Sequence, residues 1–206
     1  MSLFSQHRIT CPDCGKSEEI KLYCSINVRE DPELKGKVSN GEIFIHSCPV
    51  CGKRTLMKYP VLYHDPDAKL MIWLAYDEAA EMQAKQVFER MEQLEDYTGR
   101  IVGDVGSLIE KVHIFDAGLD DLAMEMCKYV IRQEKGNELQ LKFLRTDGAE
   151  GDLIFTYPKD GKMEMLAIGL NVYEDCRGIL SRNPDIAEGA KGLARIDEGW
   201  IARTIR

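Results

Sequence analysis

The sequence predicts an α+β protein in which an antiparallel β unit comes first, amphipathic helices follow, and an antiparallel β meander with a terminal helix comes last. Short β-branched and aromatic runs dominate residues 1–76, and such runs favour strands. Glu, Met, Ala and Leu dominate residues 78–135, and these residues favour helix. Strand-like runs return between residues 138 and 170. We therefore expect a β unit over residues 1–76 and an α+β body over residues 77–206.

The first part is predicted to form a small antiparallel sheet. Apolar and polar residues alternate over residues 20–28, as they do in a half-buried strand. The Asn40-Gly41 pair is a strong turn signal, after which residues 42–46 return as a strand. Two further extended segments follow, at residues 56–59 and 69–76. A unit of this size buries little apolar surface, so it needs a further source of folding free energy.

The second part is predicted to contain helices and then a meander. Apolar side chains recur on one helical face and charged side chains on the other, which indicates amphipathic helices. Further along, Asp-Gly turns separate short apolar runs, which predicts a three-stranded meander. The predicted helices are about residues 78–97, 104–115, 119–134 and 172–181, and the predicted strands are about residues 139–144, 152–157 and 163–168.

Charge is unevenly distributed along the chain. The 206 residues include 27 Lys and Arg against 35 Asp and Glu, and a net charge of −8 argues against a protein built mainly to bind phosphate backbones. Residues 1–64, however, are mildly basic, so this exclusion applies only to the remainder. No apolar run approaches the roughly 18 residues of a membrane-spanning helix, and no signal-peptide stretch precedes the first cysteine. We expect a cytoplasmic protein that does not bind membranes.

One hexapeptide pattern, CPxCGK, occurs twice, at residues 11–16 and 48–53. In each copy proline stiffens the backbone and glycine permits the positive φ of a tight knuckle, so two thiolates can point to one position. Two such knuckles make a tetrahedral four-sulfur site, which suits zinc and leaves no open position for a substrate. We therefore predict a zinc-ribbon-like unit with a structural zinc site, whose ligands are Cys11, Cys14, Cys48 and Cys51.

The spacing of the two knuckles is longer than usual. Between Cys14 and Cys48 lie 33 residues, whereas zinc ribbons have roughly 15 to 20. The linking segment must therefore hold more than one simple hairpin. Metal ligation would supply much of the folding free energy that this small unit lacks.

Three other chemistries of paired cysteines compete with zinc. Disulfides are disfavoured in a reducing cytoplasm. A redox CxxC pair needs a strand-to-helix junction, and neither motif is followed by helical periodicity. Iron is the more serious alternative, because CPxCG knuckles resemble those of rubredoxin and sulfur ligation alone does not distinguish the two metals. Zinc is the leading prediction, and iron is less favoured.

Two residues near the knuckles are candidates for a further ligand. Cys24 falls in the apolar row of the strand over residues 20–28, so we predict that it is a small buried hydrophobic residue. His46 lies two residues before Cys48, but four cysteine ligands already fill the coordination positions of a tetrahedral metal ion. We predict that His46 is an ordinary strand residue.

Several phrases around the knuckles add to the pattern: Asp-Pro-Glu-Leu at 31–34, Gly41, Tyr-Pro-Val-Leu-Tyr-His-Asp at 59–65, and downstream segments at 100–102, 108–112 and 114–121. In order and spacing, these phrases and the two knuckles resemble the CpXC domain family of bacterial and archaeal proteins, up to about residue 125. The resemblance implies a zinc role for the four cysteines. It implies no reaction and no catalytic residues.

Asp116, Asp120 and Asp121 form a carboxylate cluster of a kind suited to acid–base chemistry or to a hard metal. Gly118 lies among them at the expected junction of two helices. A C-cap glycine followed by acidic residues at the next helix N-terminus therefore explains the cluster without a catalytic role. The sequence contains no Gly-rich phosphate loop, GxSxG elbow, HExxH motif or kinase signature.

The leading functional hypothesis is an interaction or adaptor module with a protein partner, a structural zinc site and no catalysis. One alternative is a nucleic-acid-binding zinc ribbon, because basic side chains, including Arg8, Arg54 and Lys58, lie near the knuckles. Another is an enzyme whose site lies between the ribbon and the C-terminal part and uses Asp120, Asp121 and His64.

Overall fold

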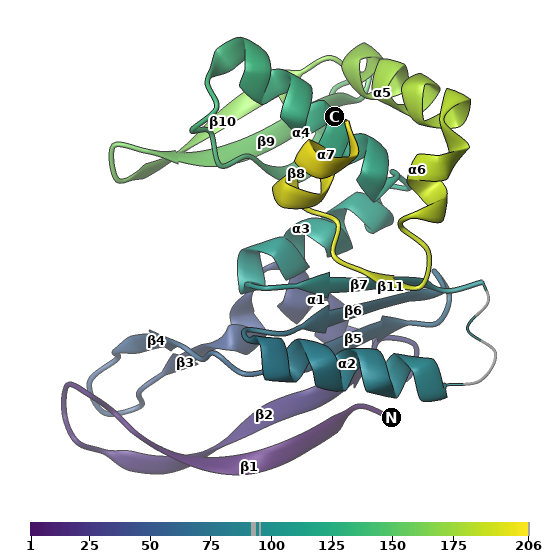
Figure 1. Cartoon of the computed structure of the whole chain (residues 1–206). Coiled ribbons are helices and arrows are strands. Elements are labelled where there is room, and N and C mark those ends of the chain that lie inside the picture. The colour runs from purple at the N-terminus through teal and green to yellow at the C-terminus, as the bar shows by residue number, and fades with distance from the viewer. Residues whose placement is uncertain (92–93, 95, 206) are drawn as a thin grey trace. The chain divides into compact units, whose positions relative to one another are not determined.

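The protein is described by a computed structural model, which covers residues 1–91, 94 and 96–205 and divides into two units, Met1–Ile109 and Glu110–Arg206. The chain combines an N-terminal antiparallel strand pair, central helices and a C-terminal antiparallel sheet, so the predicted α+β class is confirmed (Figure 1). The predicted boundary after residue 76 falls inside the first unit, and the division into two domains stays a prediction.

A mixed β-sheet forms the centre of the first unit. In spatial order its strands are β1 (Leu3–Thr10), β2 (Ser17–Asn27), β5 (Val61–Asp65), β6 (Leu70–Leu74) and β7 (Thr98–Val102). The β1/β2 and β5/β6 pairs are antiparallel, whereas the β2/β5 and β6/β7 pairs are parallel. The expectation of a wholly antiparallel sheet is therefore wrong. A parallel pair needs a crossover of about a dozen residues or more, and the long segments between these strands provide it.

Helices and a second hairpin make up the crossovers of the first unit. Between β2 and β5 come α1 (Glu33–Ser39), the 3-10 helix η1 (Glu42–Phe44), and the antiparallel hairpin of β3 (Ile45–Ser47) and β4 (Arg54–Leu56). Between β6 and β7 comes α2 (Glu78–Arg90). The α2 helix lies against the sheet (Figure 1). The ring of Phe88 in α2 lies edge-on to Trp73 of β6, with 5.8 Å between the centroids.

The region after α2 differs from its prediction. A helix was expected over residues 78–97, but α2 ends at Arg90 and Met91 is extended; residues 92, 93 and 95 lie outside the described part of the chain. The strand β7, which the sequence did not predict, then begins at Thr98. Its parallel pairing with β6 requires an extended backbone, so the chain has to leave the helical conformation before Thr98.

The second unit contains helices and the predicted meander. Its three-stranded sheet has the order β10-β9-β8, and both pairs are antiparallel. None of the helices in the described ranges combines the length and the apolar surface needed to cross a membrane. The helix α3 (Val105–Asp116) begins in the first unit, and the other elements are α4 (Asp121–Lys135), β8 (Lys142–Asp147), β9 (Asp152–Lys159), β10 (Lys162–Ile168), α5 (Leu170–Arg182), α6 (Pro184–Glu188), β11 (Leu193–Ala194) and α7 (Glu198–Thr204).

A buried network of charges connects three elements of the second unit. Glu110 of α3 accepts hydrogen bonds from Lys128 of α4 at 2.8 Å and from the Phe143 backbone N–H of β8 at 2.9 Å. Burial alone would raise the pKa of Glu110, but Lys128, Lys142 and Lys111 outweigh it and lower that pKa. Glu110 therefore stays ionised inside the unit, where it accepts from both α4 and β8.

We expect Glu110→Ala to lower the free energy of unfolding by about 3–5 kcal/mol, because it leaves the Phe143 N–H without its acceptor and Lys128 with fewer partners in the interior. The matched control is Glu134→Ala, which removes an exposed glutamate and should change stability by less than about 0.5 kcal/mol. Denaturant titration of both variants measures the difference. Equal stabilities would contradict the role assigned to Glu110.

Candidate metal centre

The two CPxCGK motifs form the turns of two hairpins. The first motif joins β1 to β2 directly after the Thr10/Ser17 pair, and the second joins β3 to β4 directly after the Ser47/Arg54 pair. Their backbone hydrogen bonds correspond: the Cys11 N–H donates to the Lys16 carbonyl at 2.8 Å, and the Cys48 N–H donates to the Lys53 carbonyl at 2.9 Å. The same sequence pattern therefore forms the same type of knuckle at both places.

Each knuckle depends on its glycine. Gly15 and Gly52 have φ values of 71° and 72°, in the left-handed region that other residues rarely adopt. Their N–H groups donate to the carbonyls of Cys11 and Cys48 at 3.0 and 2.9 Å, which closes each turn. A Cβ added at either glycine would meet no atom within 4 Å. The need for glycine here is therefore conformational and not a matter of space.

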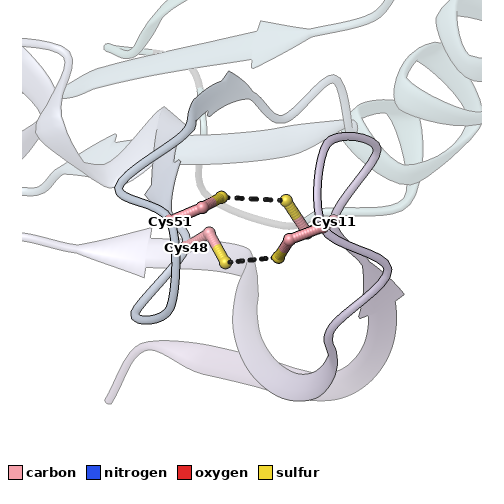
Figure 2. A group of neighbouring side chains, drawn as sticks. Cys11, Cys48 and Cys51 are labelled. Atoms are coloured by element: carbon pink, nitrogen blue, oxygen red, sulfur yellow. Dashed lines mark hydrogen bonds between the residues drawn. The ribbon is translucent and has the colours of Figure 1, made fainter.

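The four knuckle sulfurs converge on one position. The Sγ atoms of Cys11 and Cys51 are 3.6 Å apart, those of Cys14 and Cys48 are 3.7 Å apart, and all four lie within 4.8 Å of one another (Figure 2). A tetrahedral ion with metal–sulfur bonds of about 2.3 Å separates its ligands by about 3.8 Å. The cluster therefore fits a single metal ion, and these four cysteines could hold one.

The thiols of the cluster differ in pKa because backbone amides, burial and neighbouring thiols act on them to different extents. The backbone amides of Cys51 and Val50 lower the pKa of Cys48 to about 7. For Cys51, the Lys53 amide favours the thiolate, but burial and the three neighbouring thiols together raise the pKa to about 12. The first thiolate therefore forms readily at Cys48, and further negative charge in the cluster needs a cation to balance it.

The surroundings of the cluster are partly apolar. A pocket of about 310 Å³ lies beside Cys11 and Cys48, and its lining includes Ile9, His46 and Met57. His46 lies in β3, as predicted, and is outside the four-sulfur set; its Nε2 is 3.1 Å from Glu18 Oε1 of β2. This contact joins the two hairpins next to the cluster. It depends on two strand registers, so no sequence signal could have identified it.

Cys24 is exposed, so the prediction that it is buried is wrong. The register of β1 against β2 shifts by one residue here, because Leu3 pairs with Ser25 and Phe4 pairs with Tyr23. Cys24 is thus the extra residue of a β-bulge, which interrupts the alternation of buried and exposed side chains. Its Sγ lies 3.7 Å from Ser5 Oγ and outside the metal cluster.

Asp120 and Asp121 of the predicted acidic cluster have structural roles. Gly118 ends α3 with a φ of 67°, and the Asp120 carboxylate caps α4 by accepting from the N–H groups of Leu122 and Ala123. The Asp121 carboxylate is buried and accepts from Lys111 Nζ at 2.7 Å. These contacts match the helix-junction interpretation and give Asp120 and Asp121 structural roles.

His64, the third residue of the enzyme hypothesis, lies in β5. Its Nε2 is 3.2 Å from the Tyr97 hydroxyl, and burial lowers its pKa. A lower pKa favours the neutral imidazole, so His64 acts here as a hydrogen-bonding partner of Tyr97.

Comparison with known proteins gives one family. The family model described as CpXC protein matches residues 9–128, which include both knuckles. No curated protein and no solved structure matches the chain significantly.

Replacing Gly52 tests the knuckle geometry. We expect Gly52→Ala to lower the free energy of unfolding by about 1–2 kcal/mol, because alanine resists the left-handed conformation, and Gly52→Asn to lower it less. Gly36→Ala is the matched control, since Gly36 lies inside α1 with open space around it and should be neutral or slightly stabilising. Denaturant unfolding measures all three variants; a neutral Gly52→Ala would contradict the assigned geometry.

Proposed function

This chain belongs to the CpXC protein family, and on that basis we propose that its four knuckle cysteines hold one structural zinc ion. The observation that carries the proposal is the convergence of four sulfurs from two identical turns. Four protein ligands fill a tetrahedral ion, so no position is open for a substrate or an activated water. Zinc in such a site stabilises structure and does not catalyse a reaction.

The choice of zinc over iron rests on the chemistry of the donor set. Four thiolates bind either ion, but zinc has no redox chemistry and fits a tetrahedral site of purely structural use. Zinc is therefore our assignment, and iron is the outcome that the experiment below must exclude.

We further propose that the metal-bound hairpins form part of an interaction module for a protein partner. Apolar side chains lie in the open on the second hairpin: Val50, in the turn of the knuckle, is 65% exposed, and Leu56 of β4 is 52% exposed. Exposed apolar groups on a rigid support favour protein contacts. The apolar pocket beside Cys11 and Cys48 lies close to the same turn.

The two alternatives have less support. Arg54 and Lys58 are exposed and could contact phosphates, but residues 1–64 are only mildly basic. The enzyme hypothesis is weakened because Asp120 caps a helix and Asp121 lies in a buried ion pair. Nucleic-acid binding and catalysis are therefore less favoured than the interaction module.

Metal analysis of the purified protein tests the proposal. We expect about one zinc ion per chain, and a strong chelator should lower the melting temperature by about 10 °C or more, because the metal joins two hairpins of a small unit. Cys48→Ser should lose most of the zinc. Cys24→Ser, which changes an exposed cysteine outside the cluster, should retain it.

Iron in near-unit stoichiometry with a visible charge-transfer band would contradict the assignment of zinc. A metal-free protein with an unchanged melting temperature would contradict the structural role of the site.

A further inference from the structure

The outer edge of β1 is open to another strand. Among the described strands β1 is the last of its sheet, and it pairs on one side with β2. The outer side of such a strand carries backbone N–H and C=O groups that can pair with another chain. β1 has eight residues, contains no proline, and carries Arg8 as its single Lys, Arg, Asp or Glu side chain.

Both edge strands of the three-stranded sheet carry several charged side chains, whereas β1 carries one. In the second unit, β10 carries Lys162 and Glu164, and β8 carries Lys142, Arg145 and Asp147. Charged side chains on edge strands oppose pairing between chains. Exposed apolar side chains occur on both edges, Met163 and Met165 on β10 and Leu3 and Phe4 on β1, so the difference between the two edges lies in their charges.

We infer that β1 pairs antiparallel with the β1 strand of a second copy of this chain, about a two-fold axis beside Gln6. In such a pair the axis is perpendicular to the sheet, so directly opposed residues share one face and the residue at the axis faces itself. The two β1–β2 hairpins then form one continuous four-stranded sheet. This dimer does not depend on the metal or on its identity.

The side chains of β1 complement one another in this register. Gln6 faces Gln6 of the second copy, Ser5 faces His7, Phe4 faces Arg8, and Leu3 faces Ile9. Within each copy Lys21 Nζ already lies 4.3 Å from the Phe4 centroid and Arg8 pairs with Glu19 at 3.4 Å, so Arg8 would pack its apolar stem beside Phe4 of the second copy while its charge stays on Glu19. No like charges are opposed, and apolar Leu3 meets apolar Ile9.

The neighbouring register fits less well. If the axis passed beside His7, Ser5 would face Ile9 and Phe4 would face Thr10, so Ile9 and Phe4 would each lie against a polar side chain. Gln6 would then face Arg8. The two registers therefore make different predictions for a charge at residue 6.

Sedimentation of the full chain over a wide concentration range tests the dimer. We expect the mass to change from 23.4 kDa to twice that value as concentration rises. Gln6→Lys and Gln6→Glu should each weaken dimerisation about fivefold, because each puts two like charges against one another at the axis. An equimolar mixture of these two variants should dimerise at least as well as the unmodified chain, since opposite charges then meet.

The matched controls are Gln83→Lys and Gln83→Glu, which make the same charge changes at an exposed position of α2 and should leave dimerisation unchanged. A chain that stays monomeric at every concentration would overturn the inference. A dimer that neither Gln6 variant weakens would place the interface elsewhere and overturn it as well. Weakening by Gln6→Lys together with strengthening by Gln6→Glu would overturn the Gln6 register in favour of the His7 register.

Discussion

The convergence of four cysteine sulfurs ties the turn of the β1–β2 hairpin to the turn of the β3–β4 hairpin. These turns are separated by 33 residues that include a helix, so closing them together costs conformational entropy. Four clustered thiols cannot offset that cost by themselves, because ionising one opposes ionising the next. The zinc ion that we propose would reverse this and, together with the His46–Glu18 contact, would hold β3 and β4 beside β2.

Other interactions stabilise the second unit. Its helices and meander enclose an apolar cluster that includes Phe143, Phe155 and Tyr173, and a charge network around Glu110 lies in its interior. Buried charges of this kind fix which elements meet more than they add stability, since removing both partners is often harmless and removing one is costly. On our proposal the two units therefore rely on different interactions: metal ligation stabilises the first, and apolar packing stabilises the second.

The sequence predicts those features that are set by local chemistry. The repeated CPxCGK motif identified all four clustered sulfurs, and the Asp-Gly turns identified the meander. Features that depend on pairing between distant segments were not predicted or were predicted incorrectly. A one-residue bulge exposes Cys24, parallel pairing creates β7 from a weak pattern, and partners on other elements draw Glu110 and Lys128 into the interior although charges are expected on the surface. Each of these depends on a register or a contact that no local pattern encodes.

X-ray absorption spectroscopy of the purified full chain at the zinc edge tests the central claim most directly. The account predicts a first coordination shell of four sulfurs at about 2.3 Å with no nitrogen or oxygen ligand. A shell with fewer than four sulfurs, or one completed by a nitrogen or oxygen atom, would contradict the closed four-cysteine site, and the structural role assigned to it would have to be abandoned.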